Sequence, residues 1–141
     1  MNTDLTTHIY KVLKEYLSVN SKFNPTVVKK SLKQSNKFPL VVLTEENNIF
    51  KEGTLKYKSR EITDTIYWEI NIYAIDESNG KKIVSNAEIC DELKSLIDDV
   101  MSKRYGLTRV SCRPTPNLDE TIYRITMRYS GDVFVNKNRI I

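Results

Sequence analysis

One long run of alternating residues, at positions 61–75, constrains the fold of this chain more than any other feature. Its even positions are mostly isoleucine, tryptophan or alanine, and its odd positions carry threonine, tyrosine, glutamate and asparagine. Because side chains alternate faces along a strand, this period of two predicts a strand with one apolar face and one polar, aromatic face. The run is far longer than the usual strand of roughly 5–6 residues. Its apolar face must be covered, and we expect helices to cover it.

The alternation assigns the large side chains of this strand to opposite faces. Trp68 is in phase with the isoleucines, so we predict that it is a core residue and not a platform for a ligand. Tyr67, Glu69 and Tyr73 fall on the other face. Exposed tyrosines are enriched at protein interfaces, and nucleic-acid-binding proteins use them to stack bases. We therefore expect this face to bind a partner.

Apolar residues at helical spacing predict an amphipathic helix over the N-terminal segment, capped at Thr3 or Asp4 and ending near Asn20. A second, short helix is predicted to begin at Asn24, with Pro25 at its first position, where a missing N–H removes no hydrogen bond. The apolar stripe of the first helix is Leu5, Ile9, Val12, Leu13, Tyr16 and Leu17. Such a stripe is typical of a helix that covers a sheet.

A third helix follows a turn predicted at residues 76–80, and its start and end are both specified. Ser85 and Glu88 form an S-x-x-E capping box, in which each side chain binds a backbone N–H at the helix start. Gly106 is placed as the left-handed residue that ends the helix. The apolar stripe consists of Ile89, Leu93, Leu96, Ile97, Val100 and Met101.

Three further segments before the long strand are less regular. Residues 38–43 read as a short buried strand, and residues 44–53 are polar and rich in turn formers. A new alternation at residues 54–58 either continues into the long strand or forms a hairpin with it.

Two strands are predicted near the C-terminus, at residues 107–113 and 121–129, and Gly131 is expected to end the second. Arg124 and Arg128 share the polar face of that strand. The order of elements predicts a single α+β domain over residues 1–141. Its mostly antiparallel sheet has about four to five strands, with helices packed on one face.

The composition is that of a soluble globular protein, with 40% hydrophobic and 28% charged residues. No segment approaches the ~20 apolar residues of a membrane span, and the N-terminal segment has no apolar region typical of a secretory signal. We therefore expect no membrane association and a cytosolic protein with reduced thiols.

No cofactor site or nucleophile is predicted. The four glycines stand far apart, so no nucleotide-binding loop is present. His8 is the single histidine, and Cys90 and Cys112 lack the spacing of zinc ligands. Both cysteines are expected to be small core residues, so we predict neither a metal centre nor an enzyme.

Clustered carboxylates could hold magnesium in a nuclease, but the pattern here argues against it. Asp64 falls on one face of the long strand, and Glu61 and Glu69 fall on the other. Asp91, Glu92, Asp98 and Asp99 are expected on the solvated flank of the third helix.

The net charge of +4 permits anionic partners without requiring them. A lysine-rich patch at residues 29–37 is either a contact for nucleic acid or a solvated helix face.

Several segments of the chain together resemble those of a known protein family. They are FPLVV at residues 38–42, YWEINIYA at 67–74, ICDEL at 89–93 with Val100-Met101 after it, and PTPNLD at 114–119 with Tyr123-Arg124-Ile125 and Arg128-Tyr129. With these segments the chain resembles the tail terminator, or tail completion, proteins of long-tailed bacteriophages. The resemblance covers nearly the whole chain, and its motifs are structural.

The resemblance implies a non-enzymatic virion component at the head–tail interface, assembled in the bacterial cytoplasm. Such proteins form a six-membered ring that caps the tail tube protein, stops tube growth and presents a surface to the head connector. Genomic DNA only passes through the ring lumen. Stopper proteins of the head–tail connector share similar small folds, so that role is an alternative.

Two functional hypotheses follow. In the first, the chain is a ring subunit whose two contact surfaces are the face with Tyr67, Glu69 and Tyr73 and the basic face with Arg124 and Arg128. In the second, the chain is a small basic nucleic-acid-binding module that uses residues 29–37 and the tyrosine and arginine faces.

Overall fold

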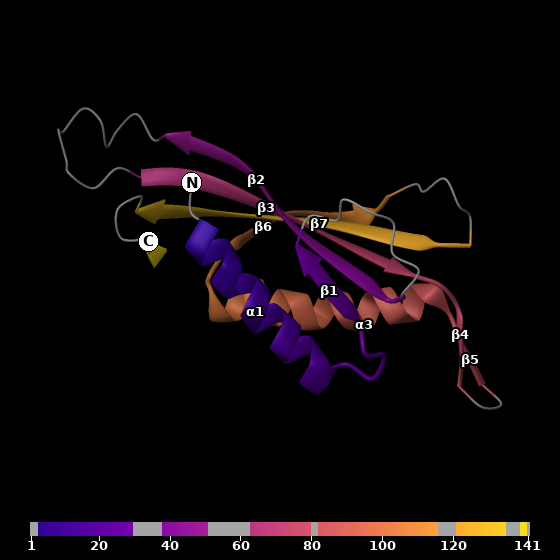
Figure 1. Ribbon diagram of the computed structural model, residues 1–141. Helices are drawn as coiled ribbons and strands as arrows, with labels where there is room; N and C mark the ends of the chain where they lie inside the picture. Colours follow the sequence, from indigo (N-terminus) through magenta and orange to yellow (C-terminus); the bar gives the residue numbers. More distant parts are fainter. Residues whose placement is uncertain are drawn as a thin grey trace.

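A computed structural model describes residues 3–29, 38–50, 63–79, 82–115, 121–134 and 139–140. Within these residues the chain forms a six-stranded mixed sheet, with two helices packed on one of its faces, and a separate two-stranded sheet (Figure 1). The strand order is β1-β2-β3-β7-β6, and β8 pairs with β7. The predicted α+β class, with a mostly antiparallel sheet, is confirmed.

The elements follow one another along the chain as two helical and several extended segments. They are α1 (Thr3–Asn20), β1 (Thr26–Lys29), β2 (Leu40–Phe50), β3 (Thr63–Ala74), β4 (Glu77–Asn79), β5 (Lys82–Val84), α3 (Asn86–Asp98), η1 (Asp99–Arg104), β6 (Thr108–Pro114), β7 (Tyr123–Phe134) and β8 (Arg139–Ile140). The η1 segment is a π-helical continuation of α3.

The long predicted strand is β3, and it is the centre of the sheet. It pairs antiparallel with β2 on one side and along its whole length with β7 on the other. Its inner face carries five side chains with no exposed surface, namely Ile66, Trp68, Ile70, Ile72 and Ala74. The predicted phase of the strand and the burial of Trp68 are confirmed.

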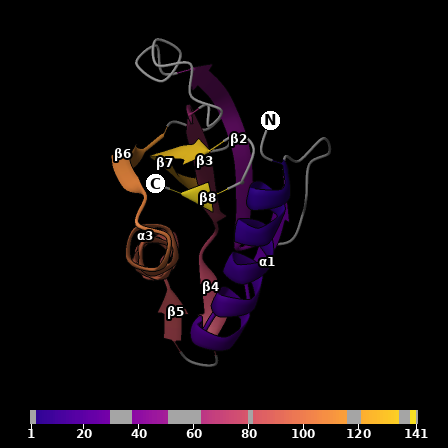
Figure 2. The same ribbon diagram turned by 90° about the vertical axis from the view of Figure 1, so that its left-hand side faces the viewer.

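Both helices cover this inner face. Leu5, Ile9, Leu13 and Leu17 of α1 are buried, and so are Ile89, Leu93 and Ile97 of α3. In Figure 2 α3 is seen along its axis while α1 runs across the view, so the two helices cross. No helix among the described residues is long and apolar enough to span a membrane.

The predicted start of the third helix at Ser85 and its end at Gly106 are confirmed, although of the capping box only the Ser85 hydrogen bond is present among the described residues. Ser85 Oγ accepts a hydrogen bond from the backbone N–H of Glu88 at 3.3 Å. At the other end Gly106 has a φ of 67°, and the N–H of Leu107 donates to the carbonyl of Met101 at 3.0 Å. The π-helical geometry between these two ends has no signal in the sequence.

The short helix predicted at Asn24-Pro25 is wrong. Thr26–Lys29 form β1, which runs parallel to β2 at the edge of the sheet. Asn24 turns the chain with a φ of 52°, and the β-branched Val27 and Val28 suit a strand that has β2 as a neighbour. The rest of that predicted helix, and residues 30–37 of the lysine-rich patch, lie outside the described residues.

Two predicted turn regions also differ from the structure. Residues 44–53 were predicted to be rich in turns, but β2 continues through them as far as Phe50, because β3 is long enough to pair with it. A register shift between Glu45 and Asn48 accommodates the irregular part of the pairing. Glu77–Asn79, predicted as part of a turn, pair with β5 in a hairpin that projects beyond the sheet (Figure 1). The alternation at residues 54–58 lies outside the described residues.

The last two strands are confirmed as β6 and β7, but Gly131 does not end β7. The strand continues to Phe134, and Gly131 pairs with Ile66 of β3. A Cβ atom at position 131 would overlap the side chain of Leu107. Glycine is therefore used here for a close approach and not to end the strand.

Candidate interaction surface on the outer face of the sheet

The face of the sheet opposite α1 and α3 carries the predicted site residues, and we call it the outer face. Both described helices lie on the other side of the sheet (Figure 1). Strand alternation and register place on the outer face Tyr67, Glu69, Asn71 and Tyr73 of β3, Arg124, Thr126 and Arg128 of β7, and Arg113 of β6. Glu46 of β2 reaches the same group through Arg128.

The register of β3 and β7 brings all five predicted site residues together. Tyr73 is directly opposite Arg124, and Glu69 is directly opposite Arg128. Each of the five side chains is half-buried. The prediction of two separate contact surfaces is therefore wrong, because the polar phases of two adjacent strands form one continuous surface.

Each tyrosine of this surface is covered by an arginine. The Arg124 guanidinium carbon lies 5.3 Å from the ring centroid of Tyr73, and that of Arg128 lies 5.6 Å from the ring centroid of Tyr67. Such cation–π contacts are worth about 0.5–1 kcal/mol at exposed sites. They hold the aromatic and the basic side chains in defined positions.

Arg128 is bound across β3 to the neighbouring strand β2. Its Nη2 donates to Glu46 Oε2 at 2.6 Å. Its Nε is buried and has no hydrogen-bond partner within the described part of the chain. Glu69 faces Arg128 in the register but makes no hydrogen bond or ion pair among the described residues.

Arg124 is held by a buried amide. Its Nε donates to Asn71 Oδ1 at 3.0 Å, and Thr126 Oγ1 donates to the same oxygen at 2.7 Å. Thr115 Oγ1 donates to Thr126 Oγ1 at 2.5 Å, which completes a chain of hydroxyl and amide groups. Asn71 is only 5% exposed and is paired with the buried Val42. In these apolar surroundings each hydrogen bond to Asn71 is stronger than it would be in water.

Asn71 was not predicted as a site residue. Its place on the polar face of the long strand is readable from the alternation. Its role depends on Arg124 and Thr126, which lie on β7, more than fifty residues later in the chain. No local pattern could have identified it.

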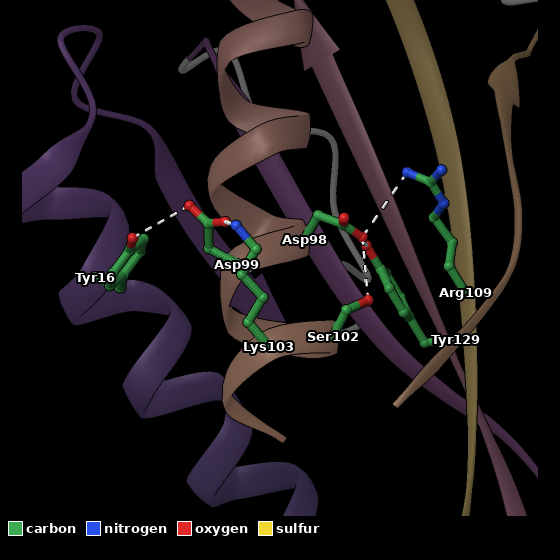
Figure 3. Close-up of polar contacts among 7 residues, drawn as sticks. All are labelled: Tyr16, Asp98, Asp99, Ser102, Lys103, Arg109 and Tyr129. Atoms are coloured by element: carbon green, nitrogen blue, oxygen red, sulfur yellow. Dashed lines mark hydrogen bonds and ion pairs between the residues drawn. The ribbon is translucent and has the colours of Figure 1, made fainter. Parts of the chain in front are cut away.

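On the opposite side of the sheet, the prediction that Asp98 lies on a solvated flank is wrong. Its Oδ1 accepts hydrogen bonds from Tyr129 Oη at 2.8 Å and from Ser102 Oγ at 3.2 Å (Figure 3). The same oxygen forms an ion pair with Arg109 Nη1 at 3.8 Å. Tyr129 is fully buried, so its hydroxyl needs an internal acceptor. Asp98 therefore joins the end of α3 to β6 and β7.

Asp99 joins the same helix to α1. Its carboxylate accepts from Tyr16 Oη at 3.4 Å and pairs with Lys103 Nζ at 3.0 Å (Figure 3). The hydrogen bond to Asp99 raises the pKa of Lys103. Two consecutive carboxylates thus attach α3 and η1 to three other elements, namely α1, β6 and β7.

The two cysteines and the single histidine differ in burial and in their contacts. Burial raises the pKa of Cys90 to about 12, so its thiol stays protonated at neutral pH. Cys112 is half-buried, and both thiols are free. His8 is exposed, and its Nδ1 lies 2.9 Å from the hydroxyl of Tyr105. Among the described residues, no group of three His, Cys, Asp or Glu side chains could hold a metal ion.

A scan of the chain against protein-family models finds no match, and a search of curated proteins finds none at a significant level.

Proposed function

We propose that this chain is a structural assembly protein that binds other proteins through the outer face of its sheet. The observation that carries the proposal is the cluster of Tyr67, Tyr73, Arg124, Arg128 and Glu69 on that face. Tyrosine and arginine are enriched at interfaces, where they supply most binding hot spots. Because the rings and guanidinium groups are already ordered, little side-chain entropy is lost on docking.

The sequence resemblance makes the proposal more specific, to a tail terminator of a long-tailed bacteriophage. The chain would form a hexameric ring that caps the tail tube and offers a surface to the head connector, with genomic DNA passing through the lumen. The resembling segments include parts of β2, β3 and α3, which are central elements of this fold. A stopper protein in the same connector is the alternative role.

A closed ring requires two different surfaces on each subunit. Since the predicted site residues form one surface, the second must lie elsewhere. We propose the β4–β5 hairpin, which projects beyond the sheet (Figure 1) and carries Ile83 with 72% of its surface exposed. The hairpin of one subunit would pack on the outer face of the next.

A nucleic-acid platform is a weaker explanation of the outer face. Base stacking requires accessible aromatic faces. The rings of Tyr67 and Tyr73 are each contacted by an arginine of the chain itself, and Glu46 neutralises Arg128. Binding of DNA that is weak at about 150 mM salt, with a shallow dependence on salt concentration, is the expected result.

The proposal is tested by assembly of purified protein on purified tail tubes, imaged by negative stain. We expect closed hexamers at tube ends for the wild type and their loss in Ile83→Ser. The matched control is Val19→Ser, since Val19 is also exposed, at 76%, but lies on α1. Hexamers that form normally with Ile83→Ser would exclude the hairpin as the second surface. No capping by the wild-type protein would exclude the terminator role.

A further inference from the structure

We propose that Arg124 is a preorganised binding site for a carboxylate, and that it receives an aspartate or glutamate side chain of a partner protein. The inference rests on the proposed role of the outer face in binding proteins. It assigns one residue as the anchor of that face and states the chemistry of the group that the partner must present.

The guanidinium of Arg124 is held by two contacts. Its Nε donates a hydrogen bond to Asn71 Oδ1 at 3.0 Å, and its central carbon lies 5.3 Å from the ring centroid of Tyr73. Asn71 is itself fixed, because Thr126 donates to the same oxygen at 2.7 Å and the amide is 5% exposed. A planar group fixed at one end loses little freedom when the other end binds.

The terminal amino groups of Arg124 are available to a ligand. A guanidinium carries five N–H donors, and only the Nε donor of Arg124 has a partner among the described residues. The two terminal amino groups form a fork that matches the two oxygens of a carboxylate. Arg128 provides the contrast, because its Nη2 is already occupied by Glu46 at 2.6 Å.

The charges of the outer face favour a carboxylate over the phosphates of a nucleic acid. Glu69 lies on the same face as Arg124 and has no cationic partner among the described residues, whereas Glu46 is paired with Arg128. A polyphosphate backbone laid across this face would meet the negative charge of Glu69. A single acidic side chain on a protein surface can reach Arg124 without meeting Glu69.

The test follows the Nε–Hε resonance of Arg124 by NMR during titration with N-acetylglutamate. N-acetylglutamine is the neutral control, and inorganic phosphate at equal ionic strength is the competing anion. We expect a saturable shift with N-acetylglutamate and none with N-acetylglutamine. Arg124→Lys, followed through neighbouring backbone amides, should weaken binding about tenfold, because the fork and the bond to Asn71 are lost.

Arg104→Lys is the matched control, since Arg104 is an exposed arginine at the end of η1, away from the outer face. Each of three results would overturn the inference. The first is that Arg104→Lys weakens binding of N-acetylglutamate as much as Arg124→Lys does. The others are that N-acetylglutamate causes no saturable shift of the Arg124 resonance, or that phosphate binds more tightly than N-acetylglutamate. The Nε–Hε resonance of Arg124 is followed in the purified protein without tail tubes, so this measurement does not depend on ring assembly. If tube capping persists in Arg124→Lys, this inference fails and the proposed function stands.

Discussion

The indole Nε1 of Trp68 donates a hydrogen bond to Thr6 Oγ1 at 3.1 Å. The hydroxyl of Thr6 in turn donates to the carboxylate of Glu45. One buried side chain of β3 is thereby tied to α1 and, through Thr6, to β2. The contact satisfies the polar atom of a tryptophan that has no exposed surface.

Trp68→Ala should lower the free energy of unfolding by about 3–5 kcal/mol or prevent folding, because it leaves a large cavity under α1. Thr6→Val should cost only about 1–3 kcal/mol, since it leaves the indole N–H without an acceptor but opens no cavity. Urea unfolding followed by far-UV circular dichroism measures both. A Trp68→Ala protein as stable as the wild type would contradict the packing described here.

Ser85→Ala should cost about 1 kcal/mol, because the N–H of Glu88 loses its acceptor at the start of α3. Ser95→Ala is the control, since Ser95 is an exposed residue inside the same helix and gains helix propensity on substitution. Chemical denaturation separates the two variants. Equal stability of both would show that the cap contributes nothing.

Gly131→Ala should destabilise the protein by about 1–3 kcal/mol, because the added methyl group overlaps Leu107. The double variant with Leu107→Ala tests the cause. Gly131→Ala should lower the free energy of unfolding by less in the Leu107→Ala background than in the wild-type background, because the overlapping side chain is gone. The effects of the two changes are therefore not additive. Strict additivity in a double-mutant cycle would exclude the overlap as the reason.

Stability should fall at alkaline pH because of buried acids. Burial raises the pKa of Cys90 from 9.0 to about 12, and burial also raises that of Tyr129. The folded state keeps these protons when the unfolded chain releases them, so the stabilisation is complete below about pH 9 and is lost between pH 9 and 12. Cys90→Ala should reduce the slope of stability against pH in this window. An unchanged slope in Cys90→Ala would contradict the assignment.

Features of this fold that depend on neighbours in sequence could be predicted, and features that depend on register could not. The phase of β3 followed from a period of two. The start of α3 followed from Ser85, and the end of its continuation η1 followed from Gly106. β1 was missed because Val27 and Val28 become a strand only beside β2. The pairing of Tyr73 with Arg124 is likewise fixed by distant segments, so one surface was predicted as two.

The roles of Asp98 and Asn71 could not be predicted either, because they depend on segments that are distant in the sequence. A carboxylate on a helix flank is usually solvated, and only the position of Tyr129 and Arg109 makes Asp98 an internal acceptor. Asn71 was placed on the correct face by alternation. Its bonds to Arg124 and Thr126 depend on the alignment of β7.

The central claim is that the outer face binds a partner protein, and the double variant Tyr67→Ala/Tyr73→Ala tests it most directly. Both rings are half-buried and lie beside arginines, so their removal should change the surface while the inner face keeps the fold. Val19→Ser/Val110→Ser is the matched control, because both valines are exposed and lie outside the outer-face cluster.

The deciding measurement is the fraction of purified tail tubes that carry a terminal ring, counted in negative-stain images after incubation with each protein. Circular dichroism of each variant establishes that the fold is intact. The account predicts capped tubes with the wild type and the valine control, and a loss of most caps with the tyrosine variant. Normal capping by a folded tyrosine variant would contradict the claim that this face is the binding surface.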